Sequence, residues 1–229
     1  MRRERLVGLV LLAVLVVLIA GCPPKPGRVP THLPQPFVPR LPIRDLTELK
    51  RLYFSTALFV VPPSGFADLE YMKARTALEK AGVKVEVAST EKGTATGVRG
   101  LWALVDASLD EVSAADYEGI VFIGGPGMID YLTDESFLRL AKTFADAGKV
   151  TAAIGVAPAI LANAGVLEGV KATVAESHEG TLRAKGAKLQ AEDVVTDGKV
   201  ITATGADAAE QFGEAIVAAL AGEELSCPT

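Results

Sequence analysis

The sequence predicts an α/β domain in which helices cover both faces of a mostly parallel sheet. From about Ala57 to Gly222, apolar runs alternate with amphipathic segments, which is the order expected when strands and helices succeed one another. The first apolar run is short and continuous, as in strands that are covered on both faces. The stretch has about 170 residues and no internal repeat, so it predicts one domain.

The strands are predicted from short apolar runs. Val83, Val85 and Val87 alternate with Lys84 and Glu86, which indicates a strand nearer an edge of the sheet. The other predicted strands are Ala57–Val61, Leu101–Val105, Ile120–Ile123 and Val150–Ile154. Two further short runs, Val194–Val195 and Val200–Ile201, flank Asp197-Gly198, a pair that is typical of a tight hairpin turn.

Three segments have the spacing of helices. The first places Ala74, Ala77, Leu78 and Ala81 at i, i+3, i+4 and i+7, with Gly82 where a helix C-cap belongs. The second runs from about Asp134 to Ala147 and ends at Gly148. The buried stripe of a closing helix is formed by Ala208, Phe212, Ala215, Ile216, Ala219 and Leu220.

Residues 1–21 have the layout of a secretory signal peptide. Three arginines lie within residues 2–5, and the apolar run from Leu6 to Ala20 is 15 residues long. A membrane-spanning helix needs about 20 such residues, so the run is short for a permanent span. Ile19-Ala20-Gly21-Cys22 resembles the lipobox of bacterial lipoproteins, in which the cysteine is acylated and becomes the mature N-terminus. The alternative is an uncleaved anchor in which Cys22 has no role.

Both alternatives place the rest of the chain in the cell envelope, outside the cytoplasm and at a membrane. Acyl chains such as palmitate on Cys22 would contribute about 0.8 kcal/mol per buried CH₂, so two or more of them form a stable anchor. Eight of the thirteen prolines lie between Pro23 and Pro42. Residues 22–55 are therefore predicted to be an extended tether of about 60 Å over its proline-rich part, unless the prolines bind a partner.

The predicted organisation is a signal peptide (1–21), a proline-rich tether (22–55), the α/β domain (56–222) and a tail (223–229). Within the tether, Ile43 to Phe54 is a candidate short helix that packs on the domain. After cleavage, 20 basic and 27 acidic side chains remain, a formal charge of −7, which argues against a nucleic-acid partner.

Cysteine and histidine are scarce. With Cys22 acylated, Cys227 is the remaining thiol, either a residue of the tail or one half of an intermolecular disulfide. His32 and His178 are the two histidines, too few for a His-rich metal site, and we expect no metal and no cofactor.

Ligands in such sheets bind at the carboxyl ends of the strands, so the turns after the strands are the candidate site. Three turns stand out: Ser64–Glu70, Gly124–Gly127 and Gly155–Pro158. The segments GFADLE, IVFIGGPG and AAIGVAPAILANAGVLEG resemble the signature turns of the PfpI/ThiJ family, within the DJ-one superfamily and its glutamine-amidotransferase-like fold. The segment VVTDGKVITATGADAAEQFGEAI resembles the C-terminal hairpin and helix of the same family, so the resemblance covers roughly residues 56–221.

The resemblance implies a flavodoxin-like three-layer sandwich that forms a homodimer. Members of the family have been described as peptidases, glyoxalases or deglycases, chaperones and stress sensors. By position in the motifs, Glu70 takes the place of the family's glutamate, and Gly124 and Gly125 take the place of its oxyanion turn. Gly155 stands at the position of the nucleophilic cysteine, and Val156 stands where many members have a histidine.

Glycine has no nucleophilic group and valine cannot act as a base, so cysteine-dependent catalysis is not expected here. No Ser or Thr lies within Gly155–Pro158, and Thr151 lies inside the preceding strand. Glu70 either faces a ligand or simply benefits from its place in the first turn of a helix. Gly124 and Gly125 either form a tight turn or offer amides to a carboxylate or phosphate.

His178 is either a residue of a solvated loop or a metal ligand or acid/base. The sequence therefore favours a membrane-tethered binding, scaffolding or chaperone-like protein, with Glu70, Gly124, Gly125, Gly155 and Val156 around a small carbonyl or carboxylate ligand. The alternative is a cysteine-independent hydrolase, glyoxalase or deglycase in which Glu70 is the acid/base.

Overall fold

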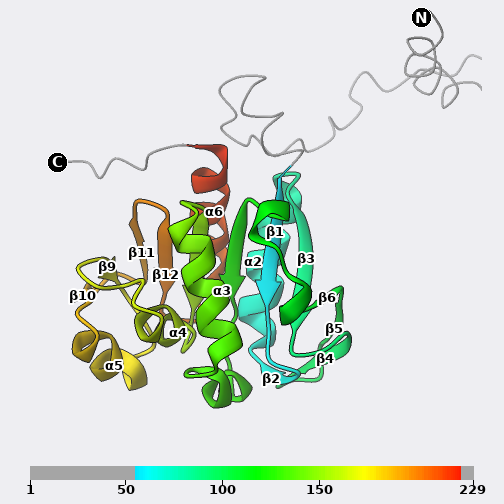
Figure 1. The fold of residues 1–229 in the computed structure, drawn as a ribbon, viewed down its shortest axis with the longest axis horizontal. Helices are drawn as coiled ribbons and strands as arrows, with labels where there is room; N and C mark the ends of the chain where they lie inside the picture. The colour runs from blue at the N-terminus through cyan, green and yellow to red at the C-terminus, as the bar shows by residue number, and fades with distance from the viewer. Residues whose placement is uncertain (1–54, 223–229) are drawn as a thin grey trace, which may run out of the picture. The chain divides into compact units, whose positions relative to one another are not determined.

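A seven-stranded sheet lies at the centre of residues 55–222, the part of the chain that the computed structural model describes (Figure 1). The strand order is β11-β12-β8-β7-β1-β3-β6, and each neighbouring pair is parallel except β11 and β12. The strands are β1 (Thr56–Val60), β3 (Lys84–Ser89), β6 (Ala107–Ser108), β7 (Gly119–Phe122), β8 (Val150–Ile154), β11 (Val194–Asp197) and β12 (Val200–Ala203). The predicted α/β class with a mostly parallel sheet is confirmed.

Four helices cover the two faces of this sheet. Helices α2 (Asp68–Lys80) and α6 (Ala209–Ala221) pack together behind it in Figure 1, while α3 (Glu135–Asp146) and α4 (Pro158–Asn163) lie in front. Strand β1 shows why a continuous apolar run is needed. Phe59 packs on the α2/α6 side and Leu58 on the α3/α4 side, and both are fully buried.

The helix boundaries follow from local chemistry that the sequence shows. The Asp134 carboxylate accepts hydrogen bonds from the Ser136 and Phe137 amides and so caps α3. Gly82 and Gly148, which follow α2 and α3, adopt φ of +89° and +64°, the left-handed conformation that ends helices. The predicted hairpin is also present, because β11 and β12 pair antiparallel around Gly198.

The strand predicted at Leu101–Val105 does not join the central sheet, which corrects that expectation. It is β5 (Trp102–Val105), which forms a separate three-stranded sheet with β2 (Ser64–Phe66) and β4 (Gly93–Gly97). Only alternate side chains of β5 are buried, whereas Trp102 and Leu104 are 69% and 62% exposed. All four residues of β5 are apolar, so the sequence shows no alternation of polar and apolar residues from which this burial pattern could be predicted.

Several short elements were not predicted, and all of them connect the main strands and helices. They are η2 (Leu109–Glu111), η3 (Ala114–Asp116), η4 (Pro126–Tyr131), β9 (Lys171–Ala172), η5 (Glu176–His178), α5 (Glu179–Ala184) and β10 (Lys188–Leu189). Elements of two to six residues carry too little periodicity to be revealed in the sequence.

Both ends of the described chain lie at the same edge of the sheet. Thr56 begins β1 and Ala221 ends α6 at the upper edge in Figure 1, whereas the carboxyl ends of the parallel strands lie at the lower edge. The predicted signal peptide, Cys22, residues 22–54 of the predicted tether with the candidate helix at 43–54, His32, and the predicted tail with Cys227 lie outside the described residues. Within residues 55–222, no helix combines the length and the apolar character that a membrane span needs.

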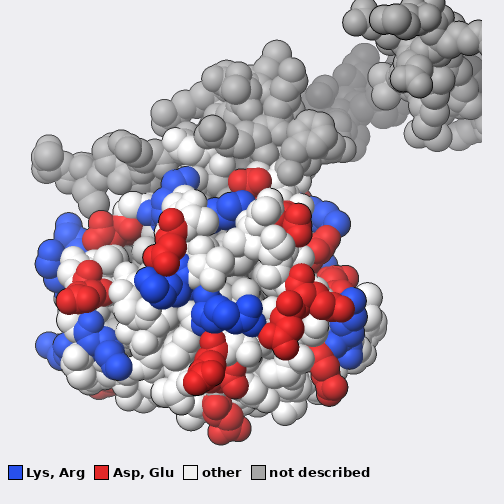
Figure 2. All heavy atoms as spheres, in the orientation of Figure 1, with Lys and Arg blue, Asp and Glu red and all other residues white. Residues whose placement is uncertain are grey.

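The charged side chains of the domain are mixed in sign. On the face shown in Figure 2, Lys and Arg lie among Asp and Glu without an extended patch of one sign. Exposed ion pairs join Arg139 to Asp110 and Lys142 to Asp146. Pairs of this kind contribute about 0–1 kcal/mol each, so they contribute little to the stability of the fold.

Candidate functional site

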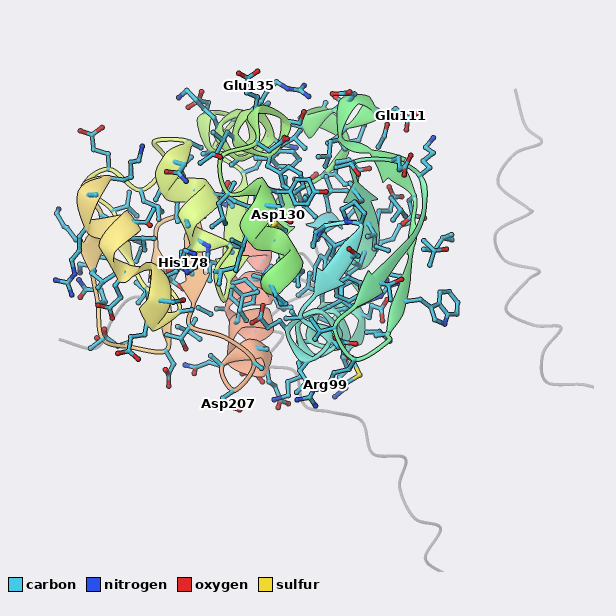
Figure 3. The ribbon with its side chains drawn as sticks, turned by 90° about the horizontal axis from the view of Figure 1, so that it is seen from below. Arg99, Glu111, Asp130, Glu135, His178 and Asp207 are labelled. Carbon is cyan, nitrogen blue, oxygen red and sulfur yellow. The ribbon has the colours of Figure 1, made fainter. Side chains whose placement is uncertain are left out.

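The three turns singled out in the sequence meet at the carboxyl edge of the sheet. Figure 3 looks onto this edge, where the labelled Asp130 lies on η4 and His178 on η5, and where Arg99 and Asp207 lie in loops. Glu70 comes from α2 after β1, Gly124 follows β7, and Gly155 follows β8. Because these three strands are neighbours and parallel, their carboxyl ends bring the three residues together.

Glu70 faces the inside of the domain. Its side chain comes from the first turn of α2, and the residue is only 7% exposed. The Gly124 amide donates a hydrogen bond to Glu70 Oε2 at 3.1 Å. Burial raises the pKa of Glu70 to about 7 and outweighs this hydrogen bond, which acts in the opposite direction. The carboxyl is therefore poised to change protonation state near neutral pH.

The second carboxyl oxygen, Glu70 Oε1, accepts no hydrogen bond from the described residues. Every fully enclosed polar side-chain atom of the described chain has a partner, so Oε1 must be reached by solvent. The site thus opens at this oxygen.

Gly155 forms the sharp turn between β8 and the start of α4. Its φ of +68° is left-handed, a conformation that costs other residues about 1–3 kcal/mol. A Cβ at Gly155 would lie 2.6 Å from Glu70 Oε1 and 2.8 Å from Oε2. The Glu70 carboxyl therefore fills the space in which a side chain at position 155 would begin.

Hydrogen bonds fix the backbone of this turn. The Gly155 amide donates to the Ala203 carbonyl at 3.0 Å, and the Gly155 carbonyl accepts from the Ala175 amide at 2.9 Å. By contrast, the amides of Gly125 and Val156 donate to no group of residues 55–222. Two N–H groups beside Glu70 are consequently available to an acceptor.

Gly124 is required by close approach. A Cβ at this position would lie 2.7 Å from the Ile154 carbonyl oxygen, 2.8 Å from Glu70 Oε2 and 3.0 Å from the Val156 nitrogen. Gly125 adopts φ of +121°, and a Cβ there would lie 2.5 Å from both the Ala67 nitrogen and the Gly65 oxygen. The Gly-Gly turn thus lets three loops meet around one carboxyl.

The other side chains considered from sequence lie outside this contact. Thr151 is fully buried within β8, and its hydroxyl donates to the Lys149 carbonyl. His178 is partly exposed on η5, with its Nδ1 2.9 Å from the Ser177 hydroxyl. The described residues contain no group of three His, Cys, Asp or Glu side chains able to hold a metal ion.

Asp68 is the residue near the site that the sequence did not reveal. Its carboxylate accepts hydrogen bonds from the Arg99 and Leu101 amides, each at 2.9 Å, and so joins the β4–β5 turn to the start of α2. Burial acts to raise the pKa of Asp68, but these hydrogen bonds hold it below its usual value. Its partners are more than 30 residues away along the chain, a contact that a local motif cannot show.

Comparison with known proteins identifies the family. The sequence model of the DJ-1/PfpI family matches residues 55–219. The chain belongs to the DJ-1/PfpI family. It is 38% identical over 166 residues to an uncharacterized protein of Methanocaldococcus jannaschii, covering 71% of this chain and 81% of that protein. It is also 30% identical over 145 residues to a deglycase of Thermococcus kodakarensis, covering 63% and 87% of the two chains.

Solved structures of DJ-1/PfpI proteins have the same fold. The ThiJ/PfpI domain protein of Brachyspira murdochii matches with a TM-score of 0.72 at 35% identity, over 74% of this chain and 98% of that one. DJ-1beta of Drosophila melanogaster matches with a TM-score of 0.67 at 31% identity, over 74% and 91%. The family resemblance and the flavodoxin-like fold that the motifs predicted are confirmed.

Proposed function

We propose that this DJ-1/PfpI protein is a membrane-tethered, extracytoplasmic binding protein that takes a small ligand at Glu70 and uses no cysteine nucleophile. One observation carries the proposal: the Glu70 carboxyl occupies the space beside Gly155 that a nucleophilic side chain would need. Covalent catalysis requires a thiol, hydroxyl, amine or carboxylate on the reacting residue, and Gly155 has none.

The chemistry of the site supports an oxygen-bearing ligand. The free amides of Gly125 and Val156 can donate to a carbonyl or carboxylate oxygen, and Glu70 Oε1 is reached by solvent beside them. Donors that are already fixed in place lose little entropy on binding. Because Glu70 is only 7% exposed, the site favours small ligands.

Attachment to a membrane rests on the N-terminal sequence, where Ile19-Ala20-Gly21-Cys22 follows a short apolar run. Labelling with a palmitate analogue in a bacterial host tests it. The natural chain should incorporate the label and sediment with membranes, whereas Cys22→Ser should do neither. Equal labelling of Cys22→Ser would reject the anchor.

Turnover assays test the absence of cysteine-type catalysis. The natural chain is offered methylglyoxal and a panel of peptides and esters, with Gly155→Cys and Gly155→Ala as matched variants. We expect no turnover by the natural chain. A gain with Gly155→Cys alone would show that only the thiol is missing, although its Cβ must first displace the Glu70 carboxyl. Turnover by the natural chain that depends on Glu70 would overturn the proposal.

A second function is favoured by one observation, the pKa of about 7 at Glu70. A carboxyl with this pKa beside free amides can act as a general base on a small carbonyl compound without a thiol. Such an enzyme would gain activity as the pH rises through 7 and lose it in Glu70→Gln. Full activity in Glu70→Gln would exclude this mechanism.

A further inference from the structure

We infer that the Glu70 site binds a small monocarboxylate together with a proton, so that one proton enters the site with each ligand anion. The inference rests on the proposed function, because it names the ligand class of the same site. It also adds a property that the proposed function lacks, a coupling between ligand affinity and pH.

The site presents hydrogen-bond donors in a number that suits a carboxylate. The Gly125 and Val156 amides are free donors, and a protonated Glu70 adds an O–H at Oε1. Glu70 Oε2 and the Val156 nitrogen lie 2.8 Å and 3.0 Å from the point where a Cβ of Gly124 would stand, so the Val156 amide lies beside the Glu70 carboxyl. Gly125 directly follows Gly124, whose amide donates to Oε2. A carboxylate offers about four acceptor positions to three such donors, whereas a carbonyl oxygen offers two.

Glycines line the floor of the site around Oε1. Gly124, Gly155 and Gly205 surround the Glu70 carboxyl, and a Cβ at Gly205 would lie 3.6 Å from Oε1. None of the three projects a side chain across that oxygen. Because Glu70 is only 7% exposed, the opening suits a small acid.

No cation of the described chain contacts the Glu70 carboxyl. The titratable groups on the elements around it are Asp68, Tyr71 and Lys73 on α2, Asp130 on η4, Glu176 and His178 on η5, and Asp207 before α6. Asp68 is engaged by the Arg99 and Leu101 amides, and the Lys73 ammonium donates to the Ala206 carbonyl at 3.0 Å. An anion placed against ionised Glu70 would therefore be repelled, and no cation of the described chain contacts the carboxyl to offset the repulsion.

Protonation of Glu70 removes this repulsion and supplies a donor at the same time. The bond from a carboxylic O–H to a carboxylate is short and about twice as strong as one between neutral groups. The pKa of about 7 in the free site means that the proton is available at little cost near neutral pH. Binding of an anion raises this pKa further, which is the coupling we infer.

Titration calorimetry on the full-length chain tests the inference, with propionate as the probe and propionamide as its neutral match between pH 5.5 and 8.5. Propionate affinity should be nearly constant below pH 6 and fall about tenfold per pH unit above pH 7. Propionamide affinity should change less than about twofold. The binding enthalpy should be measured in two buffers of different ionisation enthalpy. The difference between the two values should correspond to uptake of about one proton per propionate at pH 8.

Two outcomes overturn the inference in distinguishable ways. If propionamide binds but propionate binds without a pH dependence or not at all, the coupling is wrong and the small-ligand site stands. If neither probe binds at pH 5.5, the inference fails together with the proposed small-ligand function.

Matched variants test whether Glu70 is the group that takes up the proton when propionate binds. Glu70→Gln keeps a donor at this position in its amide, so it should bind propionate with a flat pH profile. His178→Asn replaces the histidine of η5, and it should keep the profile of the natural chain. A flat profile in His178→Asn, or an unchanged profile in Glu70→Gln, would overturn the assignment to Glu70. Circular dichroism confirms that each variant is folded.

Discussion

Two carboxyl groups lie two residues apart in the first turn of α2 and have opposite properties. Asp68 and Glu70 are 8% and 7% exposed, and each lies against a glycine of another element. Asp68 accepts two amide hydrogen bonds, and its pKa is lowered. Glu70 accepts one, and its pKa is raised to about 7. The difference has two causes: the Glu70 carboxyl lies deeper in the domain, and it accepts one amide hydrogen bond where Asp68 accepts two.

Asp68 has a structural role, whereas Glu70 is the carboxylate that we propose to be functional. Asp68 has its acceptors occupied by the backbone of the β4–β5 turn, so its role is to hold that turn against α2. Glu70 keeps one oxygen that accepts no hydrogen bond from residues 55–222, so this oxygen remains available to a ligand. The three predictions below test this division.

The largest effect is expected for Asp68→Ala, which should lower the free energy of unfolding by about 4 kcal/mol at pH 7. It leaves the Arg99 and Leu101 amides without their acceptor, at about 1–3 kcal/mol each. Urea denaturation measures the loss. Asp110→Ala, which removes a highly exposed carboxylate, is the control and should change stability by less than about 1 kcal/mol. A loss below 1 kcal/mol in Asp68→Ala would remove the structural role.

Glu70→Gln should stabilise the fold by about 3 kcal/mol at pH 8 and leave it nearly unchanged at pH 4. The folded-state pKa of about 7 lies above the ordinary value of 4.5. The folded chain thus holds more protons than the unfolded chain between these values, and its stability falls as the pH rises through them. Denaturation curves at several pH values provide the measurement. Parallel profiles for the variant and the natural chain would show that Glu70 ionises normally.

Asp68 and Glu70 should therefore affect the dependence of stability on pH at opposite ends of the pH range. The lowered pKa of Asp68 contributes stability above its ordinary pKa, and this contribution is lost as the pH falls. The Glu70→Gln variant should keep that acid limb while losing the decline above neutral pH.

The smallest of the three effects is expected for Gly155→Ala, a loss of about 2 kcal/mol. Alanine is strained at φ of +68°, and its Cβ would force the Glu70 carboxyl to move. In a Glu70→Ala background the same substitution should cost less, because the carboxyl is no longer in the way. Equal losses in the two backgrounds, measured by urea denaturation, would show that the carboxyl does not occupy this space.

The sequence was a good guide where the signal was local. The continuous apolar run of β1, the capping Asp134 and the turn at Gly198 each depend on neighbours within a few residues. The motifs around Glu70, Gly124 and Gly155 identified the family, and the topology of a parallel sheet then required them to lie at one edge.

Contacts between residues that are distant in the sequence were not predicted. Nothing near Asp68 indicates that its partners are the Arg99 and Leu101 amides, and nothing in Trp102–Val105 indicates a separate sheet. The contact between the Glu70 carboxyl and Gly155 was also out of reach, because it depends on the rotamer of one side chain and the missing Cβ of another. Which amides remain free can be known only after every other amide has been assigned.

The two ends of the described chain lie at the edge of the sheet opposite Glu70. A domain with this arrangement has a polarity: whatever joins it at Thr56 or follows it at Gly222 attaches on the side away from the site. Immobilised on a sensor surface through either end, the domain would present its ligand opening to the flowing solution.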